Sequence, residues 1–307
     1  MFGIGQGWTL GNQTRQLVFK DKQLLLYPVI SLIAAIVLFG VTLLVALGAG
    51  IATALAGGPG GYVIIGFIIL FYILVGFISM YVTMAMLIAF RSYQAGNKIG
   101  VMAALRQTAP YAGLLFQWTL VNLILVTIIR LIESRLRGIG RLAFGIGASV
   151  AITGITFFVL PIILDEKKGP FGALKESADM VAHNIGSSAV GLGASEMYSL
   201  GMIILGVLCI VGATATAGMA GAIVSIGLGA LGLILIIFGA LTASVIGQVY
   251  RFVLYEYIRG QGLPDGIDEQ AVRNIIPNVT QPSGQASGPR AKRVQKKGGA
   301  AAGDDQN

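Results

Sequence analysis

Two polar residues stand in apolar stretches where a side chain can serve transport chemistry: Glu196 and Asn122. If the helix containing Glu196 enters the membrane at Gly186, the carboxylate lies about 15 Å deep at 1.5 Å per residue. A carboxylate at that depth is a functional candidate by default. If the helix instead starts at Met197, Glu196 lies among the lipid headgroups, because about twenty apolar residues follow it and suffice for a span. Both interpretations stay open.

Asn122 lies in an apolar segment under either interpretation of the boundaries. An amide within a membrane span usually forms a hydrogen bond with a neighbouring helix, and this is the ordinary role for Asn122. The alternative is that Asn122 and Glu196 together line a polar path through a small permease or channel.

Other patterns exclude most kinds of site. The chain has one Cys and one His, so no disulfide framework or Cys/His metal site can form within it. The segment from Gly227 to Gly232 has glycines in the order of a dinucleotide-binding loop. It lies within an apolar run and lacks the preceding strand and the following acidic residue that such a loop needs. We therefore predict no enzymatic activity, no cofactor and no metal.

Small residues spaced by four instead predict close packing between helices, because small side chains let two backbones approach. They form two groups near the end of the apolar sequence: Gly221, Ser225 and Gly229, then Gly239, Ala243 and Gly247.

The composition predicts the elements that must position these residues. Of the 307 residues, 55% are hydrophobic and 11% charged, whereas soluble domains have about 25% charged residues. Charged residues are absent from four windows, at residues 23–90, 107–129, 142–164 and 197–250. Because a membrane span needs about twenty apolar residues, the two long windows hold two spans each and the two short windows one each. The sequence thus predicts an all-α, polytopic membrane helical bundle of six transmembrane helices within residues 1–259.

Amphipathic segments connect these spans, and we expect three interfacial helices at about residues 7–20, 100–112 and 170–185. The second and third are related, because Gly100–Ala109 matches Gly169–Ala178 at a constant offset of 69 residues. Two spans separate the matching segments, so both should lie on the same side of the membrane. This predicts a parallel internal repeat, and chance similarity between two short helices is the alternative.

Basic residues predict the orientation. Of the 21 Lys and Arg residues, 17 lie before the first span or after the second, fourth and sixth spans, which places them on one side of the membrane. Basic residues favour the cytoplasmic side, so both termini should face the cytoplasm from the cell membrane. Four Arg residues between the third and fourth spans oppose this rule. We expect the last helix to continue beyond the membrane to about Arg259, and a short helix at residues 268–276.

Residues 260–307 have the composition of a mostly disordered cytoplasmic tail. A basic cluster near its end fits binding to anionic lipid or simple solvation, and nucleic-acid binding is not expected. The cluster comprises Arg290, Lys292, Arg293, Lys296 and Lys297.

Several of these segments together resemble a prokaryotic family of uncharacterised six-span integral membrane proteins. The resemblance rests on Tyr27-Pro28, on Phe157–Asp165 with Pro161, on Gly169–Ala178, and on Tyr250–Gly260 with the segment to Asp268. A looser similarity links the chain to the membrane domain beside glycerophosphodiester phosphodiesterases, whose catalytic domain has no counterpart in this sequence. The resemblance implies six spans and brings no activity or site residues.

The sequence therefore predicts a multi-pass membrane protein with a non-catalytic role in membrane organisation, as a scaffold or in assisting insertion. Its expected partners are the lipid bilayer and, through the basic tail, anionic lipid. The alternative function is the small permease or channel described above.

Overall fold

The computed structural model describes residues 3–136, 138–184, 197–216, 222–264 and 266–275. Its regular elements in these ranges are helices, so the all-α prediction is confirmed. Five helical segments are long and apolar enough to cross a membrane, at residues 22–55, 60–94, 101–135, 147–166 and 223–258. A further apolar helix, α10 (Met197–Thr216), has 20 residues. The protein thus has the helices of a multi-pass membrane protein.

The chain is built from three long helical hairpins, each preceded by a short helical segment. The first unit comprises α1 (Gly3–Lys20), the 3₁₀ turn η1 (Lys22–Leu25), α2 (Leu26–Leu55) and α3 (Gly60–Gln94). The second comprises α4 (Val101–Thr108), η2 (Ala109–Tyr111), α5 (Ala112–Arg135), α6 (Gly138–Ile155) and α7 (Val159–Glu166). The third comprises α8 (Pro170–Asn184), α10 and α11 (Ala222–Ile258), and it is followed by α12 (Glu269–Ile275).

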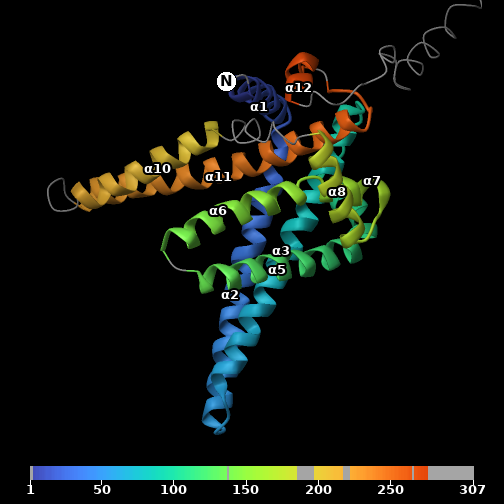
Figure 1. Ribbon diagram of the computed structural model, residues 1–307. Helices are drawn as coiled ribbons and strands as arrows, with labels where there is room; N and C mark the ends of the chain where they lie inside the picture. Colours follow the sequence, from blue (N-terminus) through green and yellow to red (C-terminus); the bar gives the residue numbers. More distant parts are fainter. Residues whose placement is uncertain (1–2, 137, 185–196, 217–221, 265, 276–307) are drawn as a thin grey trace, which may run out of the picture.

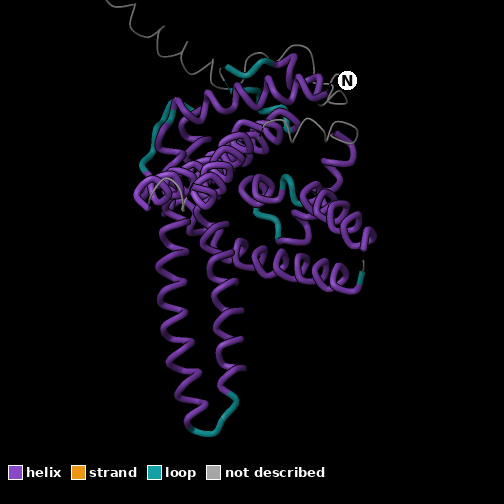
Figure 2. The backbone as a smooth tube through the Cα atoms, turned by 90° about the vertical axis from the view of Figure 1, so that its left-hand side faces the viewer, coloured by secondary structure: helices purple, strands orange, loops and turns teal. Residues whose placement is uncertain are grey.

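The three hairpins diverge from one end of the molecule. In Figure 1, α2 and α3 point downward while α10 and α11 extend to the left. Figure 2 shows α5 and α6 directed away from the α2–α3 pair. This differs from the side-by-side bundle that the sequence predicts. Side chains in the outer parts of the hairpins are exposed, as at Leu44, Leu55 and Ile226, so packing between hairpins is confined to the end where they meet.

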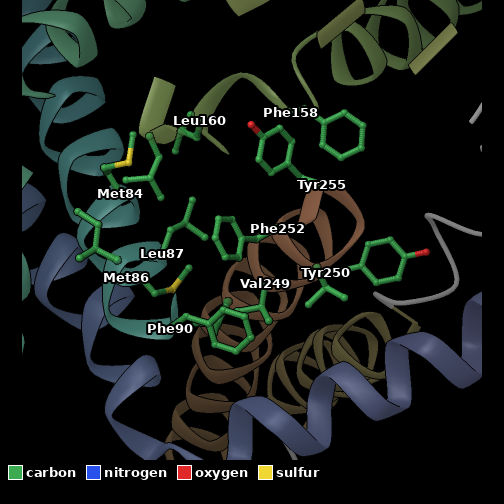
Figure 3. Close-up of a cluster of buried hydrophobic side chains, with 14 of the residues drawn as sticks. Met84, Met86, Leu87, Phe90, Phe158, Leu160, Val249, Tyr250, Phe252 and Tyr255 are labelled. Carbon is green, nitrogen blue, oxygen red and sulfur yellow. The ribbon is translucent and has the colours of Figure 1, made fainter. Parts of the chain in front are cut away.

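That common end, which we call the hub, holds the buried core. It comprises α1, α4, α7, α8 and α12 with the last turns of α3 and α11, from Val82 and Val245 onward. Figure 3 shows side chains of α3, α11 and the start of α7 meeting there. Aromatic rings join the three elements: Phe90 and Phe252 lie 6.1 Å apart between ring centroids, as do Phe158 and Tyr255.

The fourth predicted span is broken near its C-terminal end. The helix α6 ends at Ile155 and α7 begins at Val159. Pro161 explains the break, because its ring would clash with the carbonyl four residues earlier in a continuous helix. At the break, the backbone N–H of Phe158 donates to Ser177 Oγ on α8 at 2.9 Å. The interruption therefore fixes the surface helix α8 to the hub.

The C-terminal part of the described chain also belongs to the hub. The last apolar helix continues to Ile258, which confirms the predicted extension, and α12 confirms the predicted short helix. This helix packs against α1; Val272 is fully buried, and the Asp268 N–H donates to Gln13 Oε1 at 3.0 Å. The ordered domain thus extends beyond the predicted boundary at residue 259. The rest of the predicted tail, residues 276–307, lies outside the described residues.

Candidate functional site

In the described part of the chain, a set of ion pairs lies together in the hub, and we call this set the charged junction. It joins α3, α7, α8 and α11 and contains Arg91, Asp165, Glu166, Lys168, Glu176, Glu256 and Arg259.

At the centre of the junction, Arg91 binds two carboxylates from the other two hairpins. Arg91 Nη1 lies 2.5 Å from Asp165 Oδ1 of α7, and Arg91 Nε lies 3.5 Å from Glu256 Oε1 of α11. The side chain of Glu256 is 8% exposed and that of Asp165 is 16% exposed. The guanidinium also lies over the ring of Phe252, 4.9 Å from its centroid, an attractive cation–π arrangement. One arginine therefore ties together the ends of three hairpins that meet in the hub.

A second group of ion pairs continues from this centre toward the surface. Arg259 binds Glu166 and Glu176, and Lys168 binds the same two carboxylates, with 2.5 Å between Lys168 Nζ and Glu166 Oε2. Partial burial alone would raise the pKa of Glu176, but hydrogen bonds from Lys168 and Arg259 hold it below its ordinary value. Hydrogen bonds to Glu166 and Glu176 raise the pKa of Lys168. These ion pairs anchor α8 to α7 and α11.

The geometry of this site is a set of paired opposite charges. Each of its carboxylates faces a guanidinium or ammonium group. Among the described residues, no group of three or more His, Cys, Asp or Glu side chains is arranged to hold a metal ion. The arrangement resists separation of the helices, because it would part the largely buried Asp165 and Glu256 from Arg91.

The sequence analysis missed the charged junction, although a signal was present. Arg91 and Asp165 are the first charged residues after two uncharged windows that end on the same predicted side of the membrane. Glu256 follows the last window by less than two helical turns. Residues of opposite charge at equivalent ends of three spans are natural partners, because a charge near hydrocarbon is costly unless it is paired.

The surface helices α4 and α8 each turn a small-residue face toward the hub. Ala104 and Thr108 of α4 are fully buried, and so are Ala173 and Ser177 of α8. Large apolar side chains near the start of each helix face outward instead, at Met102 in α4 and at Phe171 in α8. These two side chains are 64% and 73% exposed. Each helix thus packs on the hub with small residues and presents a large apolar residue outward.

The polar residues proposed for transport are not brought together in the described part of the structure. Asn122 lies in the middle of α5 and is half-buried. Its side chain has no hydrogen-bond partner among the described residues. Glu196 lies outside the described residues, as does the basic cluster from Arg290 to Lys297.

The close packing that the structure shows between α10 and α11 centres on glycines. A Cβ at Gly232 would lie 2.6 Å from the Gly206 carbonyl oxygen, and one at Gly239 would lie 3.1 Å from the Ser199 carbonyl oxygen. Gly229 is in ordinary contact, with Ala213 Cβ at 3.7 Å. Of the other residues proposed for packing, Gly247 is buried, Ser225 and Ala243 are half-buried, and Gly221 lies outside the described residues.

Comparisons with protein-family models, with curated proteins and with solved structures find no match for this chain.

Proposed function

We propose that this protein is a six-span, non-catalytic scaffold of the cell membrane whose hub lies on the cytoplasmic face. In this proposal α2, α3, α5, α10 and α11 each cross the bilayer, and α6 with α7 forms the remaining span. The helices α1, α4 and α8 lie at the cytoplasmic surface, and both termini are cytoplasmic. Because the hairpins diverge in Figure 1, crossing one bilayer requires them to turn about the hub toward a common direction. The role of the protein is to join three lipid-embedded hairpins at the hub and to present the hub to other membrane components.

The charged junction carries this proposal. A protein that moves solutes needs polar groups that can change partners, whereas Arg91, Asp165 and Glu256 are bound to one another across three hairpins. Removing one member of a buried ion pair typically costs about 3–5 kcal/mol, because the remaining charge has no partner. Such a feature supports a fixed architecture, which is what a scaffold requires.

The burial pattern of α4 and α8 supports the proposed parallel repeat and common sidedness. Residues 69 positions apart have matching environments: Ala104 and Ala173 are both fully buried, as are Thr108 and Ser177. The same relation links exposed Met102 with exposed Phe171. Equivalent surface helices that dock on one hub by equivalent faces are expected to lie at the same membrane surface.

Topology mapping tests the architecture. Cys209 is the single cysteine of the chain, so a Cys209→Ala background allows cysteines to be introduced one at a time. We expect Lys98→Cys and Lys175→Cys to react with an impermeant thiol reagent only from the cytoplasmic side. Gly58→Cys, in the turn between α2 and α3, should react only from the other side. Labelling of Lys98→Cys and Lys175→Cys from opposite sides would refute the parallel repeat and the single cytoplasmic hub.

Two measurements test the scaffold role. Purified protein reconstituted in liposomes should give no more efflux of small ions and solutes than protein-free liposomes. A photoreactive residue at exposed Gln16 or Gln270 on the hub should form discrete adducts with membrane proteins in native membranes. Solute flux that disappears in Glu196→Gln or Asn122→Ala would instead support the permease, for which the described contacts give no support.

A further inference from the structure

The two surface helices carry the same exposed pattern of basic and apolar residues. In α4, exposed Met102 is followed one helical turn later by exposed Arg106, and exposed Lys98 precedes the helix. In α8, Phe171 and Lys175 have the corresponding positions, and exposed Lys167 precedes the helix. Residues four apart lie on the same face of a helix.

The contacts of the basic residues divide them into two kinds. Lys98 is held by Asp21, with 2.6 Å between Nζ and Oδ1, and Lys167 lies over the ring of Tyr111 at 5.7 Å from its centroid. Arg106 and Lys175 have no ion-pair partner among the described residues. Each helix thus has one positioned cation before its first turn and one cation whose charge no described residue compensates.

We propose that α4 and α8 form two equivalent binding sites for anionic phospholipid headgroups of the cytoplasmic leaflet. In each site the large apolar side chain, Met102 or Phe171, inserts at the level of the acyl chains. The cation one turn later, Arg106 or Lys175, binds the headgroup phosphate. This inference rests on the proposed function, because it requires both helices to lie at the same membrane surface.

Charge and exposure together favour a lipid over a protein partner. Interfacial helices with basic residues beside large apolar ones bind through buried apolar area and attraction to anionic lipid. The small faces that would let another helix approach closely, at Ala104 and Ala173, are already buried in the hub. The outward face of each helix therefore offers isolated large side chains and cations, which suit headgroups better than a packed protein interface.

The test uses site-specific quenching of tryptophan fluorescence by brominated lipids. The chain has two tryptophans, and replacing Trp8 and Trp118 by Phe allows Phe171→Trp or Met102→Trp to report alone. The full-length protein is reconstituted in vesicles of equal parts phosphatidylcholine and phosphatidylglycerol, with one lipid or the other brominated. We expect brominated phosphatidylglycerol to quench each reporter more strongly than brominated phosphatidylcholine.

Variants that remove one charge then test whether the basic residue of each helix causes the preference for phosphatidylglycerol over phosphatidylcholine in quenching. Lys175→Gln should reduce this preference about fivefold for the reporter at position 171, since one basic residue near an anionic surface contributes about that factor. Lys175→Arg should retain it, and Arg106→Gln should have the matching effect at position 102. The control Arg135→Gln, at the end of α5, should change neither.

Equal quenching by the two lipids, or an undiminished preference in Lys175→Gln and Arg106→Gln, would overturn the proposal. No quenching by either lipid would also overturn it, because the helices would then lie away from the membrane. This outcome is distinguishable from failure of the proposed function, since topology labelling and the flux measurement do not depend on lipid charge.

Discussion

Removal of the Arg91 guanidinium should destabilise the hub strongly, because Asp165 and Glu256 would lose their common partner. Arg91→Met retains most of the apolar stem and removes only the charge. Breaking a buried ion pair typically costs about 3–5 kcal/mol. The Arg91 side chain is 31% exposed, so solvent screens its charge. We therefore expect the free energy of unfolding to fall by an amount near the lower limit, about 3 kcal/mol. At roughly 2–4 °C per kcal/mol for a domain of comparable size, the thermal midpoint should fall by about 6–12 °C.

The assay is thermal unfolding of the purified protein in detergent, followed by near-ultraviolet circular dichroism of the aromatic residues packed in the hub. The matched control is Arg130→Met, which removes an arginine whose side chain is 75% exposed and pairs with Glu133. An exposed pair contributes about 0–1 kcal/mol, so this midpoint should hardly change.

A triple variant tests the stated cause. Adding Asp165→Asn and Glu256→Gln to Arg91→Met neutralises the two carboxylates that have lost Arg91, and it should recover part of the lost free energy of unfolding because neutral groups are cheaper to bury. If Arg91→Met costs no more than Arg130→Met, the junction does not hold the hairpins together. If the triple variant is less stable than the single one, unpaired charge is not the cause.

Three further changes test other contacts. Gly232→Ala should cost about 1–3 kcal/mol in thermal unfolding, because its Cβ would meet a backbone carbonyl at 2.6 Å, whereas Gly227→Ala, with open space, should be neutral or stabilising. Ser177→Ala should cost about 1–3 kcal/mol by leaving the N–H at the start of α7 without its acceptor. Thr108→Ala should cost less, because that hydroxyl bonds a carbonyl of its own helix. The pKa of Glu176 is lowered in the folded protein, so its ionised form contributes to the free energy of unfolding. This contribution should be complete at neutral pH and decline as the pH falls below 4.5, the ordinary pKa of a glutamate. Glu176→Gln should abolish this part of the acid sensitivity, and unchanged acid unfolding in that variant would contradict the assignment.

The sequence predicts helices well because its uncharged windows and their limits follow directly from the cost of placing charge in hydrocarbon. An apolar composition does not show which parts of the long helices are buried by protein and which are exposed at the surface of the molecule. In α3, Phe71 and Phe90 belong to one continuous apolar run, yet only the segment containing Phe90 lies in the core. Lipid and protein interior favour the same side chains, so hydropathy does not distinguish them.

The particular pairs in the hub were harder to predict than the presence of charges at the helix ends, because they join residues far apart in the sequence. Arg91 and Asp165 are 74 residues apart, and Arg259 and Glu166 are 93 apart. Local patterns cannot specify such pairs. The small-residue face of α8 was likewise overlooked because Ala173 and Ser177 resemble ordinary surface residues, and only the break before α7 gives Ser177 its role.

The three short helices also suggest why the hub can hold hairpins that diverge. Thr14 in α1 and Thr108 in α4 are fully buried and bond the carbonyl four residues earlier, while Ser177 in α8 is buried and bonds the chain before α7. The hydroxyls of Thr14 and Thr108 bond within their own helices, so α1 and α4 can pack closely at these positions without a partner from a neighbouring hairpin. Ser177 differs, because it accepts from Phe158 of the second unit and so joins α8 to the α6–α7 break. The hub thus combines helices packed through small residues with polar contacts between units, of which Arg91 with Asp165 and Glu256 joins all three hairpins.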